Sequence, residues 1–216
     1  MKKRRFKEEE LLEPVSAINF VQLSFPCQKL TEPLNRKNFK KHQLPETTSL
    51  TKEDAFADVA IGWGLEGVEI LIHSKLPYIE THFPDFSKGD AVEIMIDTRD
   101  NKSTGFNTRF CHHFFFLPES IEGTQAGEIT HFRTEDRHLL CDPSLLSVSF
   151  ERERNGYYLH AKIPREALHG YAPDQFHRLG FTYCLYHNNE RQHFSVLSEE
   201  FSIAEHPALW ASLNLS

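Results

Sequence analysis

The feature that most constrains the fold is an alternation of apolar and polar residues in two segments far apart in the chain. Residues 90–97 read Asp-Ala-Val-Glu-Ile-Met-Ile-Asp, and residues 156–163 read Gly-Tyr-Tyr-Leu-His-Ala-Lys-Ile. Successive side chains of a β-strand point to opposite faces, so this pattern is typical of strands that bury one face. The Asn155-Gly156 pair, a favoured hairpin turn, joins the second segment to a similar run at residues 146–154. These segments predict antiparallel sheet.

Further short strands are expected along the chain. They are predicted at residues 15–25, 58–63, 67–73, 109–117, 128–133, 179–187 and 192–197, with a return to the sheet at 206–215. The apolar run at 109–117 is typical of a strand buried on both faces. Many short strands separated by turn residues indicate an all-β protein. The strand pattern therefore predicts an antiparallel β-sandwich with an N-terminal extension.

Composition divides the chain into three parts. Residues 1–14 are charged and are expected to be flexible. Residues 15–54 are expected to supply one strand and then a polar connection that wraps around the surface. Residues 55–216 are predicted to form the sandwich, and the total of 216 residues suits one large β domain with this appendage.

Charge and hydropathy limit which classes of partner the protein could bind and in which cellular compartment we expect it. The formal net charge of −7 argues against nucleic-acid binding, and no apolar run approaches the ~20 residues that a membrane span needs. The basic start is followed by Lys-Glu-Glu-Glu-Leu-Leu-Glu, where a signal peptide would be apolar. We therefore expect a cytoplasmic protein, with non-classical export left open. The chain has four cysteines, Cys27, Cys111, Cys141 and Cys184. In the cytoplasm we expect them to be free thiols; two disulfides are the alternative.

Three segments carry a resemblance to a known family. Residues 90–97, residues 158–168 (Tyr-Leu-His-Ala-Lys-Ile-Pro-Arg-Glu-Ala-Leu) and residues 179–183 (Leu-Gly-Phe-Thr-Tyr) occur in the order and approximate spacing seen in the family 9 carbohydrate-binding modules and their DOMON-like relatives. A closing Pro-Ala-Leu-Trp-Ala-Ser-Leu-Asn-Leu at residues 207–215 extends the similarity. More specifically, residues 96–118 resemble an uncharacterised bacterial subgroup without an assigned activity. The resemblance implies a jelly-roll-like β-sandwich of the carbohydrate-binding-module type that binds a ligand.

The resemblance also implies a ligand-binding site. In sugar-binding members two aromatic rings stack on the apolar faces of a sugar, while polar groups bind its hydroxyls. The family's site glutamate falls on Glu93 and its site arginine falls near Arg109; the aromatic positions fall near Phe86 and Phe194. The chain departs from the family because both aromatic positions lack Trp and because Cys184 replaces a polar amide. These departures imply a site that is weakened, altered in specificity or lost.

Two groups of residues could suggest a metal ion, but the sequence predicts none. His112 and His113 are adjacent, so on a strand their rings point to opposite faces and do not converge on one ion. The other histidines are scattered without zinc-motif spacing. Asp97, Asp100 and Asn101 could offer oxygen ligands to Ca²⁺, but two neighbouring cations favour a surface turn. We expect no metal site and no cofactor.

Three classes of function follow. The first is a noncatalytic binding module for a carbohydrate or another small polar ligand, acting through a concave sheet face or its rim. The second is a cytoplasmic protein–protein interaction sandwich whose sugar site has decayed. The third is a small enzyme that uses an unrecognised carboxylate pair. An enzyme is not expected, because the sequence has no Gly-x-Ser-x-Gly, no phosphate-binding glycine loop and no His-Glu-x-x-His. Candidate partners are therefore a sugar, another small polar molecule or a protein.

Overall fold

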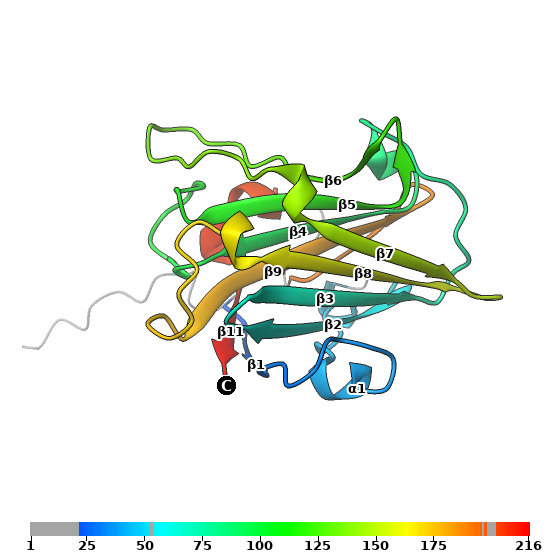
Figure 1. Cartoon of the computed structure of the whole chain (residues 1–216), viewed down its shortest axis with the longest axis horizontal. Helices are drawn as coiled ribbons and strands as arrows, with labels where there is room; N and C mark the ends of the chain where they lie inside the picture. Colours follow the sequence, from blue (N-terminus) through cyan, green and yellow to red (C-terminus); the bar gives the residue numbers. More distant parts are fainter. Residues whose placement is uncertain (1–21, 52–53, 196, 198–201) are drawn as a thin grey trace, which may run out of the picture.

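Two β-sheets pack face to face in the computed structural model, which describes residues 22–51, 54–195, 197 and 202–216 (Figure 1). The larger sheet contains β1 (Ser24–Cys27), β4 (Ala91–Asp97), β5 (Cys111–Ile121), β6 (Thr124–Glu128), β9 (Arg178–His187), β10 (Glu190–His193) and β11 (Ala211–Leu215). The smaller sheet contains β2 (Ala57–Gly64), β3 (Gly67–Ser74), β7 (Ser147–Arg152) and β8 (Tyr157–Pro164). The predicted all-β sandwich is confirmed.

The strand order places β4 in the middle of the larger sheet. That sheet runs β1–β11–β9–β4–β5–β6, with β10 also paired to β9, and the smaller sheet runs β2–β3–β8–β7. All pairs are antiparallel except β1 with β11, which is parallel. Short helical turns connect the strands: α1 (Phe39–His42), α2 (Thr48–Thr51), η2 (Phe86–Lys88), η3 (Pro143–Leu145), η4 (Arg165–Ala167), η5 (Ile203–Glu205) and η6 (Pro207–Leu209). None of the helical segments described is long and apolar enough to cross a membrane.

The core lies between the two sheets and follows the alternation seen in the sequence. On β4, Val92, Ile94 and Ile96 face this core, whereas Glu93 and Met95 point to the opposite, outer face of the larger sheet. Both sets are buried, so β4 is covered on both sides. The outer face is thus covered by loops, and it is where the candidate site is found.

One strand prediction was wrong. We expected a strand at residues 128–133, but β6 spans Thr124–Glu128. The preceding strand does not end at Pro118; β5 continues to Ile121 through a register shift and turns back at once. Glu122 and Gly123 have φ values of 52° and 85°, the positive-φ pair that a tight hairpin turn requires. The prediction at residues 15–25 falls mostly outside the described residues, where only β1 at Ser24–Cys27 is observed.

A connection from Thr31 to Thr51 packs on the outer face of the smaller sheet, and its α1 lies beside β2 (Figure 1). Leu34 and Phe39 bury their side chains in a small cluster against that face. Glu69 on β3 fixes the connection: its Oε2 accepts hydrogen bonds from the Leu34 amide at 3.0 Å and from His160 Nε2 at 2.8 Å. One carboxylate therefore ties the connection to two strands.

The Glu69→Gln substitution is expected to cost about 1.5–3 kcal/mol of unfolding free energy at pH 7, the usual value of hydrogen bonds to a charged group. Burial would raise the pKa of the Glu69 carboxyl, but hydrogen bonds from His160 and the Leu34 amide, with the Lys162 charge, hold it below its usual value. Its stabilisation is therefore present above the unfolded-state pKa of about 4.3 and is lost as the pH falls through the folded-state pKa. Urea unfolding at several pH values measures this; a difference that stays constant down to pH 3 would contradict it.

Candidate functional site

Glu93 lies at the centre of the outer face of the larger sheet. Its register partners are Phe115 on β5 and Cys184 on β9, and it is 8% exposed. The Tyr186 hydroxyl donates to Glu93 Oε2 at 2.8 Å, and His113 Nε2 lies 3.1 Å from Oε1. Burial, followed by the nearby Cys184 and Glu93, raises the pKa of the Tyr186 phenol, so the phenol stays protonated and remains a donor. A carboxylate, an imidazole and a phenol thus meet on one sheet face.

A pocket of about 250 Å³ opens beside this carboxylate. Glu93, Tyr186, Arg191 and His193 line it with polar groups, and the segment at Ser202–Glu205 forms the facing wall. The chain reaches this geometry because β10 folds back on β9 with Arg191 opposite Tyr186 and His193 opposite Cys184. Strand pairing therefore puts the other three polar side chains on the same face as Glu93.

Aromatic rings flank the carboxylate on its other side. Phe86, in η2, stacks on Phe115 at 5.5 Å between ring centroids with an 8° interplanar angle, and its ring meets the Tyr186 ring edge-on at 6.2 Å. Phe83 also stacks on Phe115 at 5.5 Å and is 38% exposed. The loop before β4 thus places Phe86 next to the Glu93 environment and adds Phe83, which the sequence did not single out. Together these rings form a partly exposed aromatic surface.

The structure does not bring Arg109 to Glu93. Arg109 precedes β5 and pairs with Asp136, and its side chain is 55% exposed. Glu93 is paired with Phe115, six residues further along, so the two positions are roughly 20 Å apart at ~3.3 Å per residue. The expected pair of Glu93 and Arg109 is therefore wrong. His113 supplies the basic group beside the carboxylate instead.

Phe194 is also not on this face. It is 1% exposed and stacks on Tyr183 at 5.4 Å within the core between the sheets. A ring in this position has no surface left for a ligand, so its assignment as a ligand-binding residue was wrong. Its neighbour His193 points to the outer face and lines the pocket. Neighbouring residues of a strand point to opposite faces of the sheet, so an alignment that is off by one residue selects Phe194 instead of His193.

Four residues on the sheet face of Glu93 were missed by the sequence argument, namely His113, Tyr186, Arg191 and His193. His113 was read only as one of two histidines on opposite faces, which the structure confirms. The alternation could have found all four, because each lies on the same sheet face as Glu93 once the strands are aligned. Among the described residues, His113 Nε2 is a buried nitrogen that makes no hydrogen bond, although it lies 3.1 Å from Glu93 Oε1.

A larger hollow of about 550 Å³ lies on the outer face of the smaller sheet. Arg36, Tyr158 and His160 are among its lining residues. Two of its groups already have partners, because Arg36 contacts Glu151 at 2.8 Å and lies over the Tyr158 ring at 4.3 Å, while His160 is bound to Glu69. This hollow is the main competitor to the Glu93 pocket as a ligand site.

The acidic turn after β4 is occupied by internal contacts. Asp97 accepts hydrogen bonds from the backbone amides of Arg99 and Asn101, at 2.9 and 2.7 Å, and Asp100 lies 2.7 Å from Lys102 Nζ. The turn is closed by its own amides and a lysine, as the sequence interpretation expected. It does not lie at the surface, however, because Asp97 is 1% and Asp100 is 5% exposed.

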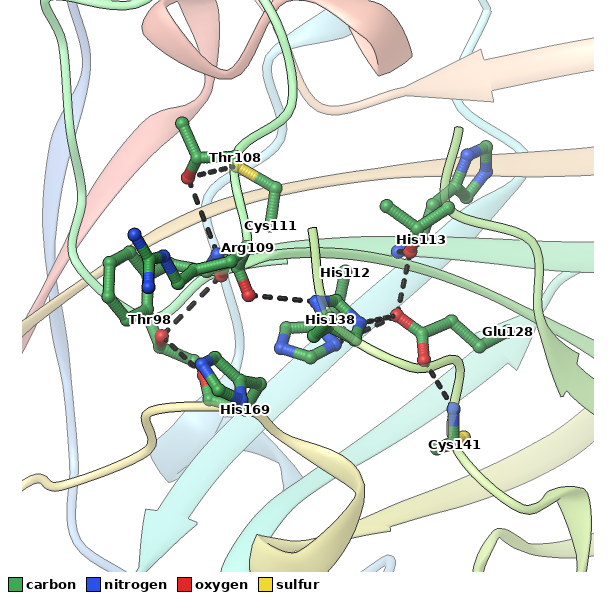
Figure 2. A network of polar contacts seen from close by, with 12 residues as sticks. Thr98, Thr108, Arg109, Cys111, His112, His113, Glu128, His138, Cys141 and His169 are labelled. Atoms are coloured by element: carbon green, nitrogen blue, oxygen red, sulfur yellow. Dashed lines mark hydrogen bonds and ion pairs between the residues drawn. The ribbon is translucent and has the colours of Figure 1, made fainter. Parts of the chain in front are cut away.

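Another group of potential metal ligands does converge. His112, Glu128 and His138 lie on the inner side of the larger sheet, and one ligand atom from each lies within 4.8 Å of the others (Figure 2). The three residues are far apart in the sequence, so no metal-binding motif could have predicted them. The four cysteines, all within the described residues, form no disulfide, and Cys141 is the least buried of them.

No model of a known protein family matches this sequence, and no curated protein is similar to it. Solved structures do share its architecture. A family 9 carbohydrate-binding module from Caldicellulosiruptor kristjanssonii in complex with glucose has a TM-score of 0.61 at 12% identity, over 89% of this chain and 95% of that chain. A family 9 module from the same organism in complex with cellotriose gives a TM-score of 0.60 at 12% identity, covering 89% and 93%.

A candidate carbohydrate-binding protein from Bacteroides uniformis also superimposes on this chain. Its TM-score is 0.54 at 9% identity, over 91% of this chain and 99% of that chain. These alignments span nearly the whole of each partner, so the likeness extends beyond a shared pair of hairpins. This chain has the β-sandwich fold of the family 9 carbohydrate-binding modules.

Proposed function

We propose that this protein is a noncatalytic carbohydrate-binding module that holds a sugar at the Glu93 pocket. The observation that carries the proposal is the meeting of Glu93, Tyr186, Arg191 and His193 in one pocket on the outer face of the larger sheet. Support comes from the fold, because solved proteins with this fold were found with glucose and with cellotriose bound. No group in this site is assigned a catalytic role.

The chemistry of the pocket suits a sugar ring. Sugar hydroxyls both donate and accept hydrogen bonds, and an ionised carboxylate accepts up to about four, of which Tyr186 supplies one to Glu93. The apolar C–H faces of a sugar pack on aromatic rings, which Phe83 and Phe86 offer at the rim. Pockets for drug-sized ligands measure about 300–1,000 Å³, so a volume of about 250 Å³ suits one sugar unit and not a long chain.

The Glu93→Gln substitution is expected to lower the affinity for the bound sugar by about 10- to 100-fold. Hydrogen bonds to a charged group contribute about 1.5–3 kcal/mol, and each 1.4 kcal/mol corresponds to tenfold in affinity. Glutamine keeps the size of the side chain but loses its charge. Calorimetric titration with glucose and cellotriose, followed by a wider glycan panel, measures the effect.

Arg109→Ala is the matched control for this experiment. Arg109 is the other polar residue implied by the family resemblance, yet it lies at the far end of the strand and contacts Asp136. Its removal should leave sugar affinity unchanged. Absence of binding across mono- and oligosaccharides, or equal affinities for the wild type and a folded Glu93→Gln variant, would refute the proposal.

A further inference from the structure

Three side chains from separate elements meet on the inner side of the larger sheet (Figure 2). His112 comes from the start of β5, Glu128 from the end of β6 and His138 from the loop that follows β6. Their side chains are 0%, 0% and 4% exposed. His112 Nδ1 lies 2.9 Å and His138 Nε2 lies 2.8 Å from the same atom, Glu128 Oε1. Two imidazole nitrogens therefore converge on one carboxylate oxygen in a buried place.

The hydrogen bonds of His138 cannot all be made by a neutral ring. His138 Nδ1 lies 2.8 Å from the Arg109 carbonyl oxygen, which only accepts, so Nδ1 carries a hydrogen. A neutral imidazole has one N–H, which leaves the lone pair of Nε2 facing the Glu128 carboxylate. Glu128 Oε1 also accepts from the Thr130 hydroxyl at 2.7 Å. The arrangement therefore calls for a positive charge, carried by a proton or a metal ion, between His138 and Glu128.

We propose that His112, Glu128 and His138 bind a divalent transition-metal ion such as Zn²⁺, through Nδ1, Oε1 and Nε2 respectively. Imidazole and carboxylate are ordinary ligands for Zn²⁺, with bonds of about 2.0–2.2 Å. Neighbouring ligand atoms around a tetrahedral ion with such bonds lie about 3.3 Å apart. The present contacts of 2.8 and 2.9 Å would open by about half an ångström to admit the ion.

The surroundings have the features of a supported metal site. The hydrogen bond from His138 Nδ1 to the Arg109 carbonyl fixes the ring so that Nε2 faces inward, and the Cys141 amide donates to Glu128 Oε2 at 2.7 Å. Such outer hydrogen bonds orient the ligands in known sites. A hollow of about 360 Å³, lined by His138, Cys141 and His169 among others, gives an entry path and room for a water as fourth ligand.

The proposed metal site is separate from the proposed sugar pocket. His112 faces the core side of β5, whereas the next residue, His113, faces Glu93 on the outer side. Failure of sugar binding would therefore leave the metal proposal standing, and the reverse also holds.

The test uses the full chain, stripped of metal with a chelator and titrated with Zn²⁺. We expect one equivalent to bind, and removal of a ligand in Glu128→Gln or His138→Gln to weaken binding at least about 100-fold. The control is His160→Gln, because His160 also lies 2.8 Å from a carboxylate, that of Glu69, but outside the triad. This control should bind Zn²⁺ as the wild type does.

A second readout does not depend on the variants being folded. Co²⁺ bound to the stripped wild-type chain should show the visible absorption of a four- or five-coordinate ion, and Zn²⁺ should abolish it by competition. Zn²⁺ should also raise the Tm, and above Kd the stabilisation should grow with the logarithm of the Zn²⁺ concentration. The proposal would be overturned by a lack of stoichiometric binding, by a Co²⁺ spectrum typical of the hydrated ion, or by equal affinity in a folded Glu128→Gln variant. The positive charge between His138 and Glu128 would then be a proton.

Discussion

Phe181→Ala is expected to lower the unfolding free energy by about 3–5 kcal/mol, the usual cost of replacing a buried Phe with Ala. Phe181 is on β9 and is fully buried, and its ring lies 6.1 Å from that of Phe194 and 6.3 Å from that of Tyr183. It faces the smaller sheet across the core, so its loss leaves a cavity that the two sheets cannot close without moving. Urea or thermal unfolding followed by circular dichroism measures the change.

Leu139→Ala provides the comparison for this experiment. Leu139 is 93% exposed, so its truncation should change stability by no more than about 0.5 kcal/mol. If Phe181→Ala cost less than about 1 kcal/mol, Phe181 would not lie in a close-packed interface between two sheets, and the sandwich described here would be wrong at its centre.

Asp90→Ala is expected to destabilise the protein by about 3–5 kcal/mol, because it would leave several buried donors unpaired. Asp90 is fully buried just before β4. Its Oδ1 accepts from His187 Nδ1 at 2.7 Å and from the Tyr157 hydroxyl at 3.1 Å, and its Oδ2 accepts from the Ile79 amide at 3.0 Å. One carboxylate thus joins β9, β8 and the loop that precedes η2.

The same substitution should also weaken sugar binding, since the anchored loop carries Phe83 and Phe86. Asp90→Asn serves as the comparison, because it retains the size of the side chain and one carbonyl acceptor and should cost less. Chemical unfolding of the two variants measures the difference. Similar, small losses below about 1 kcal/mol for both would show that this carboxylate does not hold the loop.

The strand predictions that were confirmed rested on local chemistry. The Asn155-Gly156 pair separates β7 from β8, and Asn188 and Asn189 turn β9 into β10 with φ values of 46° and 68°. Asparagine tolerates the positive φ of the second turn, whereas neither Asn155 nor Gly156 has a positive φ in the first. Turn residues of this kind still allow such hairpins to be found in a sequence. The turn at Glu122 and Gly123 was missed because Glu rarely takes a positive φ, and the short β6 was then placed too late.

The site was only partly predictable, because its composition depends on register across strands. Glu93 could be placed by its own strand, but Arg109 was assigned to the next strand without knowing that β5 pairs with β4 from Cys111 onward. Phe194 and His193 differ by one residue and lie on opposite faces, so an approximate alignment cannot separate them.

The cluster of His112, Glu128 and His138 shows a second limit of the sequence. Its members come from two paired strands and a loop, and they meet only because β6 pairs with β5 and the chain then folds back over the inner face. Short metal motifs reveal ligands that share one element. Ligands gathered from three elements require the tertiary structure.

The most direct test of the central claim is to locate a bound sugar by NMR on isotopically labelled protein. With glucose or cellotriose added, we predict that the largest shifts occur at Glu93, His113, Tyr186 and His193. Shifts confined to the hollow around Tyr158 and His160 on the other sheet would contradict the claim, as would a spectrum that the sugars leave unchanged.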